Sequence, residues 1–215
     1  MPKADTLRRI REIKVIPVLR ASKHEDAIAI AHAVHQGGIP ILEITMTVPG
    51  AVGVIRQLVA TLGDQVLIGA GTVLDAETAR SCILAGAQFV VSPGLKLSTI
   101  ELCHRYGIPV FPGALTPTEV LSAWEAGADA VKVFPCGSMG GAKYLKSLKA
   151  PLPQIELIPT GGVSLSTAAE FLSVGAFALG VGADLIDSDA ATLEKQRAIT
   201  ANAKKYIDIV RNHHP

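Results

Sequence analysis

The stretch 40–71, PILEITMTVPGAVGVIRQLVATLGDQVLIGAG, decides the fold. It opens with the apolar run 40–46 and closes with the apolar run 66–71, and a helix-length segment lies between them. A strand, a helix and a second strand in this order predict two parallel strands joined by a right-handed crossover. The stretch is therefore one unit of an α/β protein.

Short β-rich runs of the same kind recur along the whole chain. There are eight of them: KVIPVLR (14–20), PILEITM (40–46), VLIGAG (66–71), FVVSP (89–93), PVFPG (109–113), AVKVFP (130–135), ELIPTG (156–161) and ALGVG (178–182). Five of the segments between them end around a glycine, which takes the left-handed dihedrals of a helix end at little cost. These segments read HQGGI, LAGAQ, RYGIP, EAGAD and SVGAF.

Eight strand–helix units predict an α/β fold of the (β/α)8 TIM-barrel type, with residues 1–215 forming a single domain. A doubly wound open sheet is less consistent with the sequence, because RASKHEDA (20–27) after the first run lacks the glycines of a dinucleotide-binding turn. Leu7, Ile10 and Ile13 fall at helical spacing, which predicts an N-terminal helix that closes the bottom of the barrel.

Composition favours a small-molecule enzyme. The 215 residues are 49% hydrophobic and 18% charged, and the net charge is +1. Such a balance provides no field that would attract nucleic acid or an anionic membrane. The N-terminal segment MPKADTLRRIREIK has no continuous apolar run, which favours a cytoplasmic protein. Cys82, Cys103 and Cys136 are odd in number and lack CxxC spacing, so we expect reduced thiols without a structural zinc.

A lysine interrupts the sixth run, ADAVKVFP (128–135). Strand alternation puts Lys132 and Phe134 on one face and Val131 and Val133 on the other. If the valines pack against the outer helices, the Lys132 ammonium points into the barrel, where desolvation favours the neutral, nucleophilic amine. Arg20, which closes the first run, is the neighbouring charge that would act in the same direction. The simpler alternative is a structural lysine paired with a carboxylate.

A carboxylate occupies an equally apolar setting in the second run. Glu43 and Thr45 share a face, and Ile44 lies opposite. A glutamate close to a carbinolamine can move protons at each step of Schiff-base formation and bond cleavage. We therefore predict Lys132 and Glu43 as the catalytic residues of a Schiff-base aldolase. A role for Glu43 as the counter-ion of Lys132 needs the same proximity and is compatible with catalysis.

The ends of four other runs predict binding residues. The seventh run ends at Thr160, Gly161 and Gly162, and the eighth ends at Gly182 and Ala183. Barrels often bind phosphate with the loops after these two strands, where backbone N–H groups converge. Thr72 after the third run can donate to a carboxylate, and Pro93 and Phe134 can form an apolar wall. We also predict Thr45 and Thr47, around the end of the second run, as substrate-binding residues. The glycines could instead serve tight turns alone.

Two other enzyme classes remain open on these residues. A phosphosugar isomerase or epimerase would use Glu43 for proton abstraction and would need no covalent attachment. A metal-dependent lyase would need a ligand cluster, and His32 and His35 lie three apart on a predicted outer helix without an acidic partner. We therefore expect neither a metal site nor a cofactor.

Seven segments in order resemble one family: IPVLR, LEITMTVPGA, IGAGTVLDAE, AGAQFVVSPGL, FPGALTPTE, KVFP and IPTGGV. They are similar to the bacterial 2-keto-3-deoxy-6-phosphogluconate aldolases, also called 4-hydroxy-2-oxoglutarate aldolases, over roughly residues 10–187. The resemblance implies a class I lyase of the Entner–Doudoroff pathway, typically a homotrimer, that yields pyruvate and glyceraldehyde 3-phosphate. It can extend to 4-hydroxy-2-oxoglutarate or to oxaloacetate decarboxylation.

The resemblance also implies roles for single residues. Lys132 would carry the Schiff base and Glu43 would be the general acid and base. Arg20 and Thr72 would hold the keto-acid end, and the glycine turns would take the phosphate. Two positions depart from the common pattern: Thr47 stands where many members have an arginine, and Ala183 stands where others have a serine. Loss of that hydroxyl should weaken phosphate discrimination by roughly 1 kcal/mol.

Overall fold

The computed structural model describes residues 1–63, 65–186 and 192–213, and its strands are parallel. One sheet has six strands in the order β5-β4-β3-β2-β1-β9, and a second has three in the order β6-β7-β8. The strands are β1 (Val15–Leu19), β2 (Ile41–Thr45), β3 (Leu67–Gly71), β4 (Val90–Val91), β5 (Val110–Phe111), β6 (Gly113–Ala114), β7 (Val131–Val133), β8 (Leu157–Pro159) and β9 (Leu179–Val181). The predicted α/β class and parallel pairing are confirmed.

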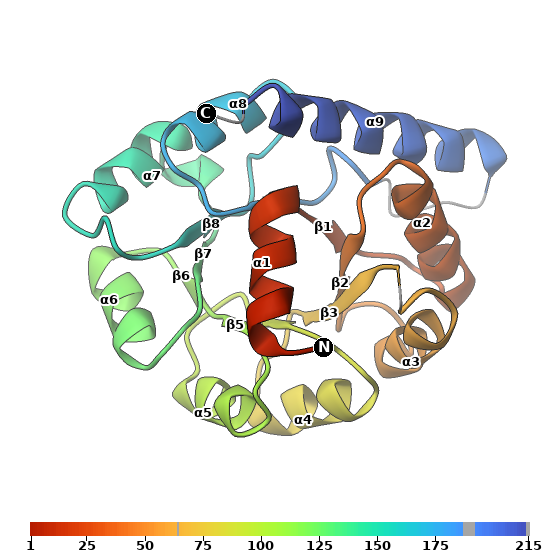
Figure 1. Cartoon of the computed structure of the whole chain (residues 1–215), viewed down its shortest axis with the longest axis horizontal. Coiled ribbons are helices and arrows are strands. Elements are labelled where there is room, and N and C mark those ends of the chain that lie inside the picture. Colours follow the sequence, from red (N-terminus) through yellow and green to blue (C-terminus); the bar gives the residue numbers. More distant parts are fainter. Residues whose placement is uncertain (64, 187–191, 214–215) are drawn as a thin grey trace.

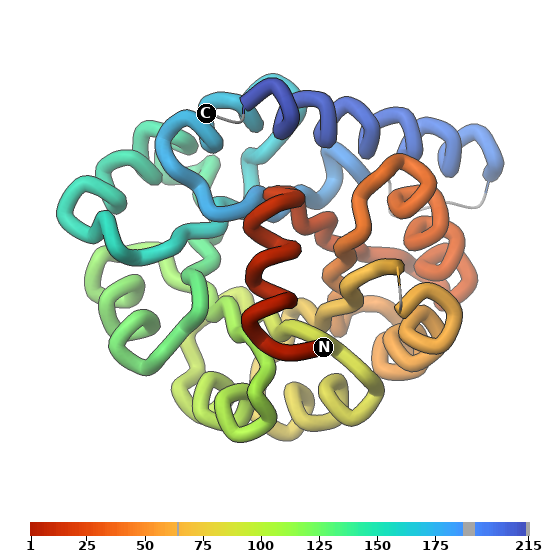
Figure 2. The backbone as a smooth tube through the Cα atoms, viewed as in Figure 1, coloured from red at the N-terminus to blue at the C-terminus, as the bar shows by residue number. Residues whose placement is uncertain are grey.

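Helices surround the strands (Figure 1). They are α1 (Lys3–Ile13), α2 (His24–Gln36), α3 (Ala51–Leu62), α4 (Ala76–Leu84), α5 (Leu97–Arg105), α6 (Pro117–Glu125), α7 (Ala142–Lys149), α8 (Ala168–Ser173) and α9 (Leu193–Arg211), with a short 3-10 helix η1 (Gly137–Met139). The backbone trace shows α9 running along one side, next to α2 and α8 (Figure 2). Each sheet is thus covered by helices on its outer face.

Glycine ends five helical segments, as the sequence predicts. Gly38, Gly86, Gly107, Gly127 and Gly175 all have positive φ, between 66° and 103°. Each lies in one of the five segments that the sequence marked as helix ends, and each is followed closely by a strand. An L residue with a side chain rarely adopts this conformation, so glycine at these points ends the helix and redirects the chain.

The fifth predicted strand is interrupted at Pro112. Residues 110–111 pair with β4, and residues 113–114 pair with β7, so this one run supplies an edge strand to each sheet. Pro112 has no N–H to donate, but its carbonyl accepts from the Lys132 N–H at 2.9 Å. The sixth predicted strand is shorter than expected, since β7 ends at Val133 and Phe134 lies beyond it.

Helix α1 lies against the segments that precede the strands. The Arg9 guanidinium donates to the Gln65 carbonyl just before β3, and Lys3 pairs with Asp129 just before β7 at 2.7 Å. Arg11 pairs with Glu156 before β8 at 3.0 Å and lies over the Phe177 ring before β9. These contacts place α1 over the amino ends of the strands, as the helical spacing predicted.

The core is built mainly from aliphatic residues, and it encloses the charged side chains of Glu43 and Lys132. Every residue of β1 to β3 is buried, and Glu43 and Lys132 are only 2% and 5% exposed. Cys82, Cys103 and Cys136 are buried free thiols. Burial raises the pKa of Cys82 and Cys136 to about 11 and that of Cys103 to about 12, so these thiols are poor nucleophiles. In the described residues, no helix combines the length and apolar character that a membrane span requires.

Candidate active site

Lys132 and Glu43 meet in the interior from different sheets. Lys132 lies on β7 and Glu43 on β2, and the distance from Nζ to Oε1 is 3.7 Å. Their side chains are 6% and 3% exposed. The Phe134 ring lies on the same side as the amine, with Nζ 5.4 Å from its centroid. The structure therefore brings the predicted nucleophile and the predicted acid–base group to one water-poor place.

Burial dominates the electrostatics of Glu43. Desolvation raises the pKa of its carboxyl above the usual 4.5, and the opposing charges of Lys132 and then Arg20 only partly offset this effect. Its Oε1 atom accepts no hydrogen bond from the described residues. A carboxyl group with a raised pKa and an unused oxygen is suited to take up and return a proton.

A glycine makes room for this carboxylate. Gly71 on β3 pairs with Thr45, next to the Glu43–Gly69 pair in the ladder. A Cβ on Gly71 would lie 2.0 Å from Glu43 Oε1 and 2.6 Å from its Cδ. The sequence showed a glycine-rich strand end here, but its function depends on the register between β2 and β3.

Replacing Gly71 by alanine should therefore displace the Glu43 carboxylate. We expect kcat/KM to fall by about 10- to 100-fold, because a shift near 1 Å in a reacting group has an effect of this size. The fold should persist, since the displaced atoms are the end of a side chain. Steady-state kinetics and thermal melting of Gly71→Ala test this against Gly53→Ala, where a Cβ meets nothing within 4 Å. Unchanged kinetics for Gly71→Ala would contradict the proposed steric relation.

Arg20 and Thr72 flank the pair at strand ends. Arg20 follows β1 and is exposed, but its charge still lowers the pKa of Glu43. Thr72 follows β3 with φ of 56°, a conformation that is rare for a β-branched residue. Strain of this kind clusters at functional sites. Thr72 lies at the carboxyl end of β3, next to the Gly71 that faces Glu43.

Thr45, predicted as a substrate-binding residue, is hydrogen-bonded to the strand next to it. Its side chain is fully buried, and its hydroxyl donates to the Leu19 carbonyl at 2.9 Å. The single hydroxyl proton is thereby used, so the exposed Thr47 donates to Thr45 Oγ1 across 2.7 Å. Thr45 thus joins the ends of β1 and β2 and holds Thr47, and its contact with a substrate stays a prediction.

Pro93 lies beside the strand that precedes Lys132. A Cβ on Gly113 would be 2.2 Å from the Pro93 carbonyl, and Gly113 pairs with Lys132 in the ladder. Ser92 is buried and donates to the Gly94 carbonyl at 2.7 Å, which fixes this turn. Pro93 and Phe134 are both half-buried, so each offers apolar surface near the amine.

The two glycine turns lie at neighbouring strand ends. Thr160 forms a bridge with Gly180, and the place of a Cβ on Gly180 is filled by Thr160 Oγ1. Gly161 and Gly162 have φ of 81° and 79°. No oxygen of the described residues accepts a hydrogen bond from the N–H groups of Gly161, Gly162, Gly182 or Ala183. These donors are available to an anion.

Candidate metal ligands do not gather in the described ranges. No group of three or more His, Cys, Asp or Glu side chains there could hold an ion. His32 and His35 lie on α2, outside the strands, and His35 Nε2 is 3.0 Å from Gln65 Oε1.

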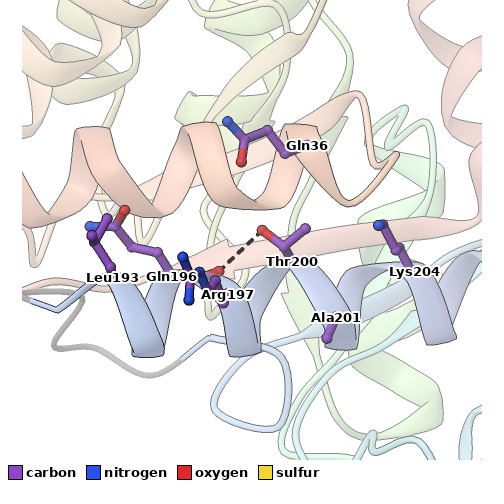
Figure 3. Close-up of a pocket in the computed structure, with 7 residues that line it drawn as sticks. All are labelled: Gln36, Leu193, Gln196, Arg197, Thr200, Ala201 and Lys204. Carbon is purple, nitrogen blue, oxygen red and sulfur yellow. Dashed lines mark hydrogen bonds between the residues drawn. The ribbon is translucent and has the colours of Figure 1, made fainter.

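A separate groove of about 400 Å³ runs between α2 and α9 (Figure 3). Gln36 borders it on α2, and Leu193, Gln196, Arg197, Thr200, Ala201 and Lys204 border it on α9. The helices approach closely here, since a Cβ on Gly37 would be 2.3 Å from that of Ala203. None of the predicted site residues lines this groove, so it is distinct from the Lys132–Glu43 site.

Comparison with known proteins gives one family. The model for "KDPG and KHG aldolase" matches residues 7–202. A 2-dehydro-3-deoxy-phosphogluconate aldolase from Treponema pallidum is 38% identical over 76% of this chain and 78% of its own. A protein of the same name from Haemophilus influenzae is 32% identical over 95% of this chain and 96% of its own. A 2-dehydro-3-deoxy-6-phosphogalactonate aldolase from Escherichia coli is 34% identical over 93% of this chain and 98% of its own.

A solved structure has the same architecture. It is a KDPG aldolase from Legionella pneumophila with pyruvate captured as a covalent carbinolamine intermediate. It is 30% identical to this chain, the TM-score is 0.84, and the match covers 92% of this chain and 96% of the other. In that protein, pyruvate thus forms the adduct that precedes a Schiff base.

Proposed function

Because this chain belongs to the KDPG and KHG aldolase family, we propose that it cleaves 2-keto-3-deoxy-6-phosphogluconate to pyruvate and glyceraldehyde 3-phosphate through a Schiff base on Lys132. The observation that carries the proposal is the buried pair of Lys132 and Glu43 at 3.7 Å. Cleavage of 4-hydroxy-2-oxoglutarate to pyruvate and glyoxylate is a second reaction of the same site. An isomerase or epimerase is not favoured, since the relatives are aldolases.

The chemistry divides between the two side chains. Lys132 Nζ attacks the C2 ketone, and the carbinolamine loses water to give an iminium ion. Glu43 takes the proton of the C4 hydroxyl as the C3–C4 bond breaks, and the bonding electrons enter the iminium to form an enamine. Glu43 then returns the proton to C3, and water releases pyruvate and the free amine. The raised pKa of Glu43 supports its use in both directions.

The binding residues surround this pair. Arg20 and Thr72 hold the substrate carboxylate, with Thr47 beside them and held by Thr45. Pro93 and Phe134 form the apolar wall that keeps water from the iminium ion. The strained backbone of Thr72 supports this assignment, because the surrounding fold must hold it in place.

The phosphate occupies the two glycine turns. The free N–H groups of Gly161, Gly162, Gly182 and Ala183 face no other acceptor among the described residues, and Thr160 supports the junction between the turns. Ala183 offers a backbone donor but no hydroxyl. We therefore expect a weaker preference for phosphorylated substrates than a serine at this position would give.

The two sheets together form one (β/α)8 barrel in a single domain, residues 1–215. Pro112 links β5 to β6 within one run, and the Asp129 N–H donates to the Val110 carbonyl at 3.1 Å. On the other side, the Phe177 N–H donates to the Leu157 carbonyl at 2.8 Å, and Thr160 bridges to Gly180. These contacts support closure at both seams. A homotrimer is the assembly that we propose on the resemblance stated above.

An assay of the wild-type protein tests the function. Pyruvate release should be measured from the phosphorylated keto acid and from 4-hydroxy-2-oxoglutarate, with and without a chelator. Since the iminium ion accepts the electrons, we propose a metal-independent reaction that the chelator does not slow. Borohydride with pyruvate should add a stable mass to the peptide that contains Lys132. Turnover without any borohydride-trapped adduct would refute the Schiff base, and inhibition by the chelator would refute metal independence.

A further inference from the structure

Asp184 connects the two glycine turns to helix α9. It follows Gly182 and Ala183, and its Oδ2 accepts from the Tyr206 hydroxyl at 2.6 Å and from the Leu165 N–H at 3.1 Å. Leu165 lies in the segment that follows Gly162, whereas Asp184 lies in the turn after β9. One carboxylate oxygen therefore bridges both turns, and a tyrosine on α9 holds that oxygen.

Other contacts also hold the two turns. Thr160 bridges to Gly180 where the two strands end, the Gly137 N–H donates to the Gly161 carbonyl at 2.8 Å, and the Asn202 side-chain amide donates to the Asp184 carbonyl at 3.4 Å. The Thr167 hydroxyl donates to the Gly162 carbonyl at 3.1 Å, and the Ile186 N–H donates to the Gly182 carbonyl at 3.0 Å. The Thr160–Gly180 bridge fixes the strand ends from which the turns start, whereas beyond the strand ends the bond from the Leu165 N–H to Asp184 Oδ2 joins one turn to the other. Asp184 is itself exposed, so its orientation depends on its partners.

Tyr206 is a rigid partner. It has no exposed surface and lies on α9, which packs against α2 and α8. Burial, and next the bond to Asp184, raise the pKa of its phenol, so the hydroxyl remains a donor at all physiological pH values. A hydrogen bond from a neutral donor to a carboxylate is short and stronger than one between neutral groups.

The Asp184 carboxylate also bears a charge that would repel a phosphate in the adjacent turn. Its Oδ2 oxygen is held by Tyr206 and Leu165, so the group cannot rotate freely toward Ala183. A second cost of losing Tyr206 would thus be an unrestrained anion beside the N–H groups of Gly182 and Ala183.

We infer that Tyr206 is a positioning residue for phosphate recognition: through Asp184 it holds the two glycine turns together beyond the Thr160–Gly180 bridge. This inference rests on the proposed function, because it takes those turns as the phosphate site. It assigns to the outer helix α9 a part in substrate selectivity, at a distance from the Lys132–Glu43 pair.

The test is Tyr206→Phe, which keeps the buried ring and removes only the hydroxyl. We expect KM for the phosphorylated keto acid to rise about tenfold, with kcat, activity on 4-hydroxy-2-oxoglutarate and pyruvate trapping on Lys132 unchanged. Binding of inorganic phosphate, measured by calorimetry, should weaken by a similar factor. Tyr106→Phe is the matched control, since it removes a phenol that accepts from Arg80 far from the turns, and it should change neither quantity.

Variants of Asp184 separate positioning from general stability. Asp184→Ala should lower the preference for the phosphorylated keto acid as Tyr206→Phe does. The double variant should lose no more of this preference than either single variant, because both changes break the same connection. Asp184→Asn keeps an oxygen that accepts from both donors, so it should retain the wild-type preference or exceed it. The inference would be overturned if Tyr206→Phe lowered kcat/KM equally for the phosphorylated keto acid and for 4-hydroxy-2-oxoglutarate, or if it left phosphate binding unaltered. The calorimetric result does not depend on turnover, so it remains decisive if the chain proves not to cleave the phosphorylated keto acid.

Discussion

Lys132→Met is expected to abolish aldol cleavage, with kcat/KM reduced by more than about 10³-fold, because methionine fills similar space without an amine. Pyruvate and borohydride should then add no mass to the protein. Lys132 is 5% exposed and its amine lies 3.7 Å from Glu43 Oε1, so the variant removes the buried amine that stands next to the acid–base group. Mass spectrometry of the trapped protein and steady-state kinetics measure the two effects.

The fold of Lys132→Met should survive despite the loss of a buried ion pair. Removal of one partner typically costs about 3–5 kcal/mol when the other charge stays unpaired. Here burial already raises the pKa of Glu43, so the carboxyl can take up a proton instead. Lys146→Met, at an exposed position on α7, is the control and should trap pyruvate as wild type does. Trapping at the wild-type rate in Lys132→Met would end the assignment of Lys132 as the nucleophile.

Glu43→Gln should lower kcat by about 10²- to 10⁴-fold, the usual contribution of a general acid–base group. The amide keeps the shape that fits above Gly71, so the effect reports the lost proton transfer rather than a cavity. Trapping of pyruvate should still reach completion, but more slowly, since Lys132 is present. Rapid-quench measurement of trapping and of cleavage separates the two steps.

The pH profile gives an independent reading of the same residue. Burial raises the pKa of Glu43 above 4.5, and the general base must be ionised, so wild-type activity should fall as the pH drops through that raised value. The acidic limb therefore lies above pH 4.5, and Glu43→Gln should lack it. An identical limb in the variant would assign that ionisation to another group.

Local patterns predicted much of this structure because they arise within short segments. The apolar runs became parallel strands, and the glycines at five helix ends have positive φ. The failures lie where a distant segment intervenes. The hydrogen bond from the Thr45 hydroxyl to the Leu19 carbonyl, on another strand, was not predicted. Pro112 divides one predicted strand between two sheets, which depends on the partners available on each side.

The sequence by itself determined where strands occur along the chain and which of their side chains share a face, since the alternation of a strand is a property of its own backbone. Only the tertiary structure decided that Lys132 on β7 lies 3.7 Å from Glu43 on β2, that Gly71 leaves room for the carboxylate, and that Tyr206 holds Asp184. Such contacts join segments far apart in the chain. They depend on strand register and on how the sheets curve, and neither is encoded in the pattern of any single segment.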